Sequence, residues 1–192
     1  AATIDFTEAN LANADLSGAT LTASDANDAT IDFTKANLAD ADLSGSNLTA
    51  KSQTDATIDF TGATLANTDL SGSALTATAT AGSYSGDATI DFAEANLADA
   101  DLSGSTLTAT ADNDATIDFT KANLADADLS GWALTADTIV GLAPPPSSPP
   151  PCVNTKNNCK KKKCKKYSDA KKLKCKKTCD VCDGLPQSPP SS

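Results

Sequence analysis

The sequence predicts an all-β solenoid of about five coils, followed by a small module of a different kind. Five Phe residues recur 27, 27, 32 and 27 positions apart, and the stretch TIDFTKANLADADLSG occurs twice without a change. Within each block the large apolar residues fall at every fifth position, a period that fits neither a helix nor a flat strand. Aromatic residues make up only 4% of the chain, so its core must consist of small side chains in regular layers. A fixed period above about 20 residues indicates stacked units of this kind.

Each block supplies one coil of the predicted solenoid. In every unit of five, the large residue and the small residue two places earlier point inward, and the chain turns a corner. Four units make a square coil of about 20 residues, and the remaining seven, such as ASDANDA after Thr22, are expected to form a loop on one edge. A small residue beside each Leu keeps the narrow interior from being overfilled. The expected core stacks are Phe6, Phe33, Phe60, Phe92 and Phe119, and Leu11, Leu38, Leu65, Leu97 and Leu124.

The segment ANLADADLSG resembles the A(D/N)LXX unit of pentapeptide-repeat proteins. The resemblance extends in twenty units over nearly all of residues 2–136. It implies a right-handed quadrilateral β-helix. The regular seven-residue insert departs from the uninterrupted coil of that family.

Stacking at about 4.8 Å per coil would align equivalent residues in columns. Two of these columns consist of Asp, whose adjacent carboxylates repel one another by about 1 kcal/mol per pair in water. They either bind a cation such as Ca²⁺ or attract a basic partner, or they form a solvated surface that keeps an Ala-rich rod soluble. The columns are Asp5, Asp32, Asp59, Asp91 and Asp118, and Asp15, Asp42, Asp69, Asp101 and Asp128.

The ends of the solenoid indicate self-association. A terminal coil exposes unpaired backbone and apolar core, and repeat proteins usually cap both ends. Here the first unit begins within a few residues of Ala1, and only WALTADTIVGLA offers a cap at the other end. Either Trp132, Ile139 and Val140 close the last coil, or this end is adhesive. We expect the first coil to stack on another subunit.

Composition divides the chain into four segments. The repeat module, 1–143, has three Lys and 22 acids, and the remainder has twelve Lys and three acids. A Pro-rich linker, 144–151, is expected to be extended polyproline II, and a tail, 183–192, repeats its composition. Such Ser-Pro-Pro runs resemble the hydroxyproline-rich linkers of algal and plant extracellular glycoproteins; an unmodified linker is the alternative. Candidate glycosylation sites are Pro144, Pro145, Pro146, Pro149, Pro150 and Pro151, and Asn47 in the sequon Asn47-Leu48-Thr49.

Between the Pro-rich segments, residues 152–182 hold all six Cys. An even count in a tiny basic module indicates disulfides, and zinc is disfavoured because the chain has no His. The Cys spacing, ending in KKTCDVC, resembles that of the helical ShKT domain. The resemblance implies the pairs Cys152–Cys182, Cys159–Cys175 and Cys164–Cys179, but not channel blocking, since Asp169 and Ala170 stand where toxins of this family have Lys and Tyr. A basic contact patch is expected at Lys160, Lys161, Lys162, Lys163, Lys165 and Lys166.

No residue is nominated for catalysis, for cofactor binding or for a metal site, so we expect no enzyme. No apolar run approaches the roughly 20 residues that span a bilayer, and the missing initiator Met indicates that a leader peptide has been removed. The sequence predicts an extracellular or cell-surface structural protein, without cofactor, whose rods join head to tail into a filament or coat. Alternatives are a secreted monomer whose basic knob binds an anionic glycan or a receptor, a thylakoid-lumen protein, and a DNA mimic of the kind that inhibits topoisomerases. Disulfides imply an oxidising compartment away from DNA, so no nucleic-acid partner is expected.

Overall fold

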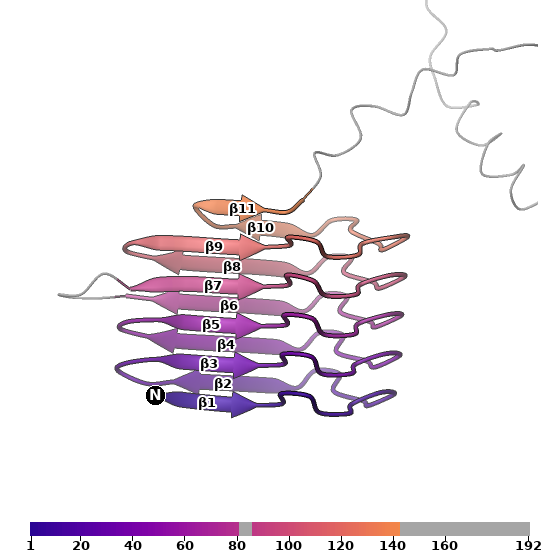
Figure 1. Cartoon of the computed structure of the whole chain (residues 1–192), viewed down its shortest axis with the longest axis horizontal. Helices are drawn as coiled ribbons and strands as arrows, with labels where there is room; N and C mark the ends of the chain where they lie inside the picture. The colour runs from indigo at the N-terminus through magenta and orange to yellow at the C-terminus, as the bar shows by residue number, and fades with distance from the viewer. Residues whose placement is uncertain (81–85, 143–192) are drawn as a thin grey trace, which may run out of the picture. The chain divides into compact units, whose positions relative to one another are not determined.

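Parallel strands stacked coil upon coil form the repeat module (Figure 1). The computed structural model describes residues 1–80 and 86–142, and the compact unit that they form is Ala1–Leu142. All its regular elements are strands, so no described segment is a helix that could cross a membrane. The strands are β1 (Ala2–Asp5), β2 (Thr20–Ser24), β3 (Ala29–Asp32), β4 (Asn47–Ser52), β5 (Ala56–Asp59), β6 (Ala74–Ala79), β7 (Asp87–Asp91), β8 (Thr106–Ala111), β9 (Asp114–Asp118), β10 (Ala133–Thr135) and β11 (Thr138–Val140).

The strands form two sheets, one from each long side of the coil. The first has the order β1-β3-β5-β7-β9-β11 and the second β10-β8-β6-β4-β2, with every neighbouring pair parallel. The register joins equivalent residues, so Ile4 pairs with Ile31 and Leu21 with Leu48. The β-solenoid predicted from the repeats is therefore present in the described residues.

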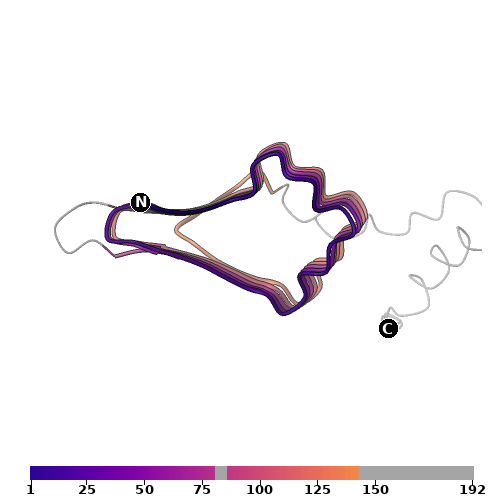
Figure 2. The same cartoon turned by 90° about the horizontal axis from the view of Figure 1, so that it is seen from below.

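The expectation that seven residues loop out of each coil is wrong. The strands run into this segment from both sides: β2 ends at Ser24 and β3 begins at Ala29, so only four residues make the connection. Ala23 and Ala29 are buried between the two sheets. The insert thus lengthens both sheets and draws the coil out on one side (Figure 2). Only small side chains are buried where the two sheets converge: Ala in most coils, and Ser52 in the second.

The other side of each coil consists of short pentapeptide faces joined by tight turns. In the first coil the N–H of Ala9 donates to the Phe6 oxygen at 2.9 Å, and Ala14 and Ala19 repeat this contact with Leu11 and Leu16. The third residue of each turn has a positive φ. Such turns favour Gly or Asn at this position, and the sequence supplies Gly18 and Asn13 at two of the three turns.

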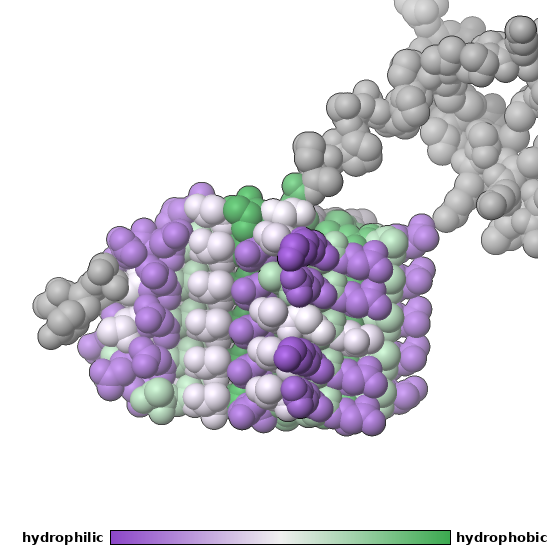
Figure 3. All heavy atoms as spheres, in the orientation of Figure 1, coloured by the Kyte–Doolittle hydropathy of each residue, from purple (hydrophilic) through white to green (hydrophobic). Residues whose placement is uncertain are grey.

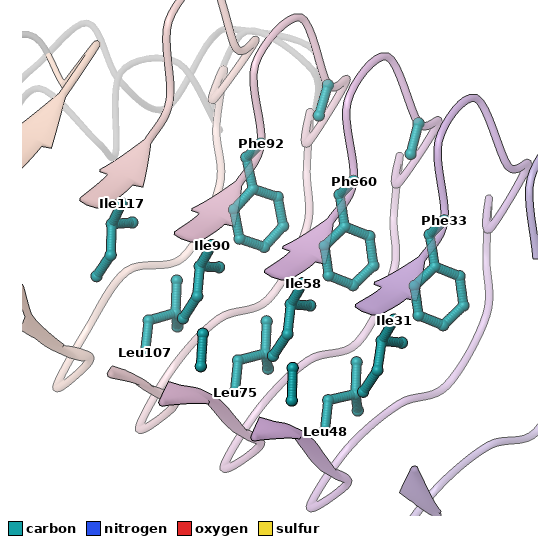
Figure 4. Close-up of a cluster of buried hydrophobic side chains, with 14 of the residues drawn as sticks. Ile31, Phe33, Leu48, Ile58, Phe60, Leu75, Ile90, Phe92, Leu107 and Ile117 are labelled. Carbon is teal, nitrogen blue, oxygen red and sulfur yellow. The ribbon is translucent and has the colours of Figure 1, made fainter. Parts of the chain in front are cut away.

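Ladders of identical apolar residues fill the interior (Figure 4). The Phe rings stack with centroids 4.8 to 5.1 Å apart and nearly parallel planes. Phe33, Phe60, Phe92 and Phe119 are fully buried, as are Leu38, Leu65 and Leu97. Phe6, Leu11 and Leu124 pack on this core but remain partly exposed, because each lies in an end coil with a neighbour on one side only.

Candidate functional site: the two ends of the solenoid

The Asp columns stabilise turns along the sides of the solenoid. In all ten Asp residues Oδ1 accepts the backbone N–H two residues later, from 2.6 Å at Asp118 to 3.1 Å at Asp15. This Asx-turn contact is the local interaction for which Asp is favoured at turns. Among the described residues no group of three or more acids is arranged to hold a metal ion. The Asp columns therefore have a structural role that accounts for their residue type.

The carboxylates of neighbouring coils nevertheless repel one another, and this repulsion affects the pKa of Asp91. Burial raises the pKa of Asp91 above its ordinary value, and the neighbouring carboxylates of Asp59 and Asp118 raise it further. In the end coil, by contrast, the hydroxyl and then the N–H of Ser17 lower the pKa of Asp15. A raised carboxyl pKa means that ionisation destabilises the folded state, and this cost grows as the pH rises past the ordinary Asp pKa.

We expect Asp91→Asn to raise the free energy of unfolding by about 1 kcal/mol at neutral pH. The amide keeps an oxygen to accept the Ala93 N–H and removes the charge between Asp59 and Asp118. The gain should vanish below about pH 4, where the Asp91 carboxyl is protonated in both states. Urea unfolding at pH 7 and pH 3 measures it, with Asp91→Ala as the control that loses the hydrogen bond as well. A gain of equal size at both pH values would contradict the electrostatic cause.

The two ends carry matching sets of backbone groups that have no partner among residues 1–80 and 86–142. Between coils the N–H of Glu8 donates to Thr34, Lys35 to Thr61 and Glu94 to Thr120, all at 2.9 Å. The same groups of the last coil have no backbone acceptor in the described part of the chain; they are the N–H groups of Lys121, Leu124, Asp126, Leu129 and Gly131. The corresponding carbonyls of the first coil accept no backbone N–H from described residues; they belong to Thr7, Asn10, Ala12, Asp15 and Ser17.

A smaller set of groups runs in the opposite direction. Asn37, Asp42 and Asn47 donate their N–H groups to carbonyls of the coil before, at 2.8 to 2.9 Å. In the first coil the equivalent N–H groups, of Asn10, Asp15 and Thr20, have no such acceptor among residues 1–80 and 86–142. In the last coil the carbonyls of Ala122, Ala127 and Trp132 have no such donor there. Donors at one end therefore match acceptors at the other in the spacing that already joins the coils.

A column of charged residues shows the same complementarity. The third position of the first turn is occupied in successive coils by Glu8, Lys35, Gly62, Glu94 and Lys121. Each has a positive φ, which is uncommon for Glu and Lys. Lys121 Nζ lies 2.7 Å from Glu94 Oε1, in the coil before. The column thus begins with an anion and ends with a cation. This pattern was not among the sequence predictions, although aligning the repeats places these charged residues at equivalent positions.

Apolar residues accompany these groups at both ends. Ile4, Phe6, Leu11, Leu16 and Leu21 of the first coil are half-buried, whereas their equivalents in the second coil are buried. At the opposite end Ile139 is 41% and Val140 36% exposed, and Figure 3 shows apolar spheres there above the polar sides. The sides themselves show columns of like colour, as expected from the register.

Among the described residues, the C-terminal end is covered over the first sheet but not over the second. The strand β11 pairs with β9, and the Phe119 N–H donates to the Val140 oxygen at 2.9 Å. The Trp132 ring lies 5.7 Å from that of Phe119 at an angle of 58°. Phe119 is buried although it is last in its stack, while Phe6, first in the same stack, is partly exposed. WALTADTIVGLA therefore caps the first sheet and leaves Leu124, Leu129 and Leu134 half-buried.

The remaining sequence-predicted sites divide between the two parts of the chain. Asn47 is exposed on β4, where its Oδ1 accepts the Thr49 hydroxyl at 2.9 Å, whereas Leu48 of the same sequon is buried. The six Cys with their three expected pairs, the Lys patch and the candidate Pro sites lie outside the described residues.

Comparisons with known proteins relate this module to one kind of repeat. Residues 4–32 and 31–49 match the family model of pentapeptide repeats, in 8 copies. No curated protein matches the chain. Solved structures that match include a pentapeptide repeat protein from the Arabidopsis thaliana thylakoid lumen, which is 20% identical in sequence. The match covers 64% of this chain and 59% of that chain, with a TM-score of 0.25.

Two cyanobacterial structures also match. HetL, a pentapeptide repeat protein involved in heterocyst differentiation regulation from Nostoc sp., has 22% identity, with 68% of this chain and 65% of that chain covered and a TM-score of 0.28. Rfr23 from Cyanothece has 18% identity, with coverage of 68% and 90% and a TM-score of 0.24. The chain thus spans less than two thirds of the lumen protein and of HetL. Residues 4–49 match the model of pentapeptide repeats, and the strands of the later coils continue in the same register, so the module is a β-solenoid whose first coils are similar to pentapeptide repeats.

Proposed function

We propose that this protein is a structural subunit that assembles head to tail into an extracellular filament, appendage or surface coat. The observation that carries the proposal is the match between the ends: eight backbone groups of the first coil are complementary to eight of the last coil. Complementary edges of parallel strands are a common way for chains to join. Head-to-tail contacts that do not close into a ring give an open filament.

The charge column supports the same orientation. In a head-to-tail junction Glu8 of one copy would follow Lys121 of the preceding copy in the column, as Lys121 follows Glu94 within one chain. Lys121 and Glu94 are both largely exposed, so each such pair contributes little to stability and is screened by salt. Charge therefore selects the orientation, and the backbone groups supply most of the affinity.

The proposal also includes the handedness of the solenoid, the nature of the Cys-rich segment, the glycans and the location of the filament. The solenoid is a right-handed quadrilateral β-helix of the family type, with one side drawn out by the insert. Residues 152–182 form a ShKT-like disulfide domain, and the Pro-rich segments carry glycans, as does Asn47. The filament lies outside the cell, and its subunit has no enzymatic activity. Disulfide and glycan mapping of the native protein by mass spectrometry tests these assignments directly.

We expect Thr20→Pro to weaken self-association roughly 100-fold without lowering the stability of the monomer. The Thr20 N–H has no backbone acceptor in the described residues, so Pro at this position removes no hydrogen bond that these residues make. At the junction the same N–H would donate to the Trp132 carbonyl of the preceding copy. Light scattering and electron microscopy of the full chain measure assembly, and Thr20→Ala, which keeps the N–H, is the matched control.

Other outcomes would contradict head-to-tail assembly. A wild-type protein that stays a monodisperse monomer at low and high salt alike would exclude it. Filaments that form equally well from Thr20→Pro would place the contact elsewhere on the molecule.

A second candidate is a secreted monomeric binding protein. It is favoured by the cap that β11 and Trp132 form over one sheet, and by the Lys run at 160–166. In this case the repeat module is a spacer, and the basic segment engages an anionic glycan. Binding of heparin by a monomer, lost on deletion of residues 144–192, would support this candidate over the first.

A further inference from the structure

The last strand of the solenoid repeats the sequence and the register of the first. Thr138 and Ile139 of β11 pair with Thr116 and Ile117 of β9. In the same way Thr3 and Ile4 of β1 pair with Thr30 and Ile31 of β3. The strands β1 and β11 are thus the two edge strands of the same sheet. Because β11 continues the first sheet beyond β9, it lies where the β1 strand of a following copy would lie in an uninterrupted stack.

This strand is short and weakly covered. It contains three residues, and Ile139 is 41% exposed, whereas Ile31, Ile58, Ile90 and Ile117 are buried. Val140 stands at the position that is Asp in the five other strands of this sheet, so the Asx turn that follows each of them is absent. A second copy would offer a longer strand, Ala2–Asp5, at the same place.

Gly141 makes the close approach of β11 to the last coil possible. Its φ is +76°, and a Cβ atom there would overlap the backbone of Phe119 and Thr120. Any larger residue must therefore move β11 away from β9, since backbone atoms cannot yield as a flexible side chain can. The position is thus sensitive to a single added methyl group.

Trp132 completes the cover. The residues at its position in earlier coils are Ala19, Ser46, Ser73 and Ser105, all small. The Trp132 ring supplies the aromatic neighbour that Phe119 would otherwise receive from a further Phe, at 5.7 Å instead of about 5 Å. It meets Phe119 at 58° and not in a parallel stack, so it blocks continuation of the Phe ladder.

We propose that β11 and Trp132 form a displaceable plug that occupies the docking place of β1 and Phe6 of a second copy. The inference rests on the proposed head-to-tail assembly and adds a mechanism that regulates when a second copy can dock. The plug keeps the C-terminal end of a free subunit closed over one sheet, while the pentapeptide faces and β10 stay open to make the first contacts. The arriving β1 then replaces β11 in the same register, with β9 as the shared partner.

Gly141→Ala tests the plug, with Gly72→Ala as the matched control. Gly72 has a similar φ of +63° but no atom within 4 Å of the added Cβ, so it reproduces the backbone strain without a clash. In dilute full-length monomer, exchange of the Phe119 amide should become at least about 10-fold faster in Gly141→Ala, since its acceptor is Val140. The association constant measured by light scattering should rise at least about 10-fold. Gly72→Ala should change neither quantity.

Trp132→Ser is an independent second variant, because Ser is the residue of three earlier coils. It should also promote association, and more strongly when combined with Gly141→Ala. Phe119 amides that stay protected in both variants would show that β11 is not displaceable and would overturn the plug. A different outcome is faster exchange of the Phe119 amide in these variants without any gain in association, while the wild type still forms filaments that Thr20→Pro weakens. That result would overturn the plug and leave head-to-tail assembly standing. If no variant and no wild-type sample assembles, both proposals fail.

Discussion

Replacing Phe60 with Ala should lower the free energy of unfolding of the repeat module by about 3 to 5 kcal/mol. Phe60 is fully buried and stacks on Phe33 and Phe92, with ring centroids 4.8 Å away on each side. The variant loses the transfer free energy of the ring, leaves a cavity and breaks two aromatic contacts, each of which contributes about 0.5 to 1.5 kcal/mol. Urea unfolding followed by circular dichroism measures the change.

Phe6→Ala is the matched control for this prediction. Phe6 stacks on Phe33 alone and is partly exposed, so its loss should cost roughly half as much. In a solenoid each coil interacts only with its neighbours, so a break at the middle coil should also make the unfolding transition broader. Equal losses of stability in Phe60→Ala and Phe6→Ala would show that the Phe ladder is not the continuous core described above.

Introducing Pro at Ala74 should cost about 3 kcal/mol or more, although Thr20→Pro at the same position of the first coil should cost nothing measurable. The Ala74 N–H donates to the Ser46 carbonyl at 2.8 Å, in the coil before. Pro removes this donor, leaves the Ser46 oxygen without its partner and places the pyrrolidine ring against the neighbouring coil. Thr20 has no coil on that side in the described residues.

Thermal unfolding of the two Pro variants beside Ala74→Gly measures the difference. Ala74→Gly keeps the N–H and controls for the loss of the methyl group. A Thr20→Pro monomer destabilised as strongly as Ala74→Pro would mean that the Thr20 N–H already has a partner in the free subunit. The end of the solenoid would then not be open for docking.

Much of the architecture follows from the repeat itself. A chain that places Phe at residues 6, 33 and 60, with Leu at intervals of five between them, can bury all of these residues only by stacking equivalent positions. Parallel strands in register follow, because a shift by one residue would turn the apolar set outward. The core ladders and the Asp columns are consequences of that register.

The path of the seven-residue insert could not be derived in this way. ASDANDA contains no large apolar residue, and by composition it looks like a loop. Its first and last residues, Ala23 and Ala29, are buried because the two sheets approach closely there, whereas Ala26 between them is exposed. The space between the sheets is so narrow that a methyl group fills it. Burial of so small a side chain leaves no signal in the hydrophobic pattern.

The role of the ends was likewise decided by the tertiary structure. Trp132, Ile139 and Val140 are recognisable in the sequence as candidates for a cap, but whether they close the coil depends on where the chain returns after residue 132. In the structure β11 returns to β9 and covers one sheet only. By itself the sequence determined that the coils are alike, because the same residues recur at a constant spacing. Only the tertiary structure decided which backbone groups have no partner among the described residues, since hydrogen bonds between coils join residues far apart in the sequence, such as Glu8 and Thr34, and no local pattern specifies where such a ladder stops.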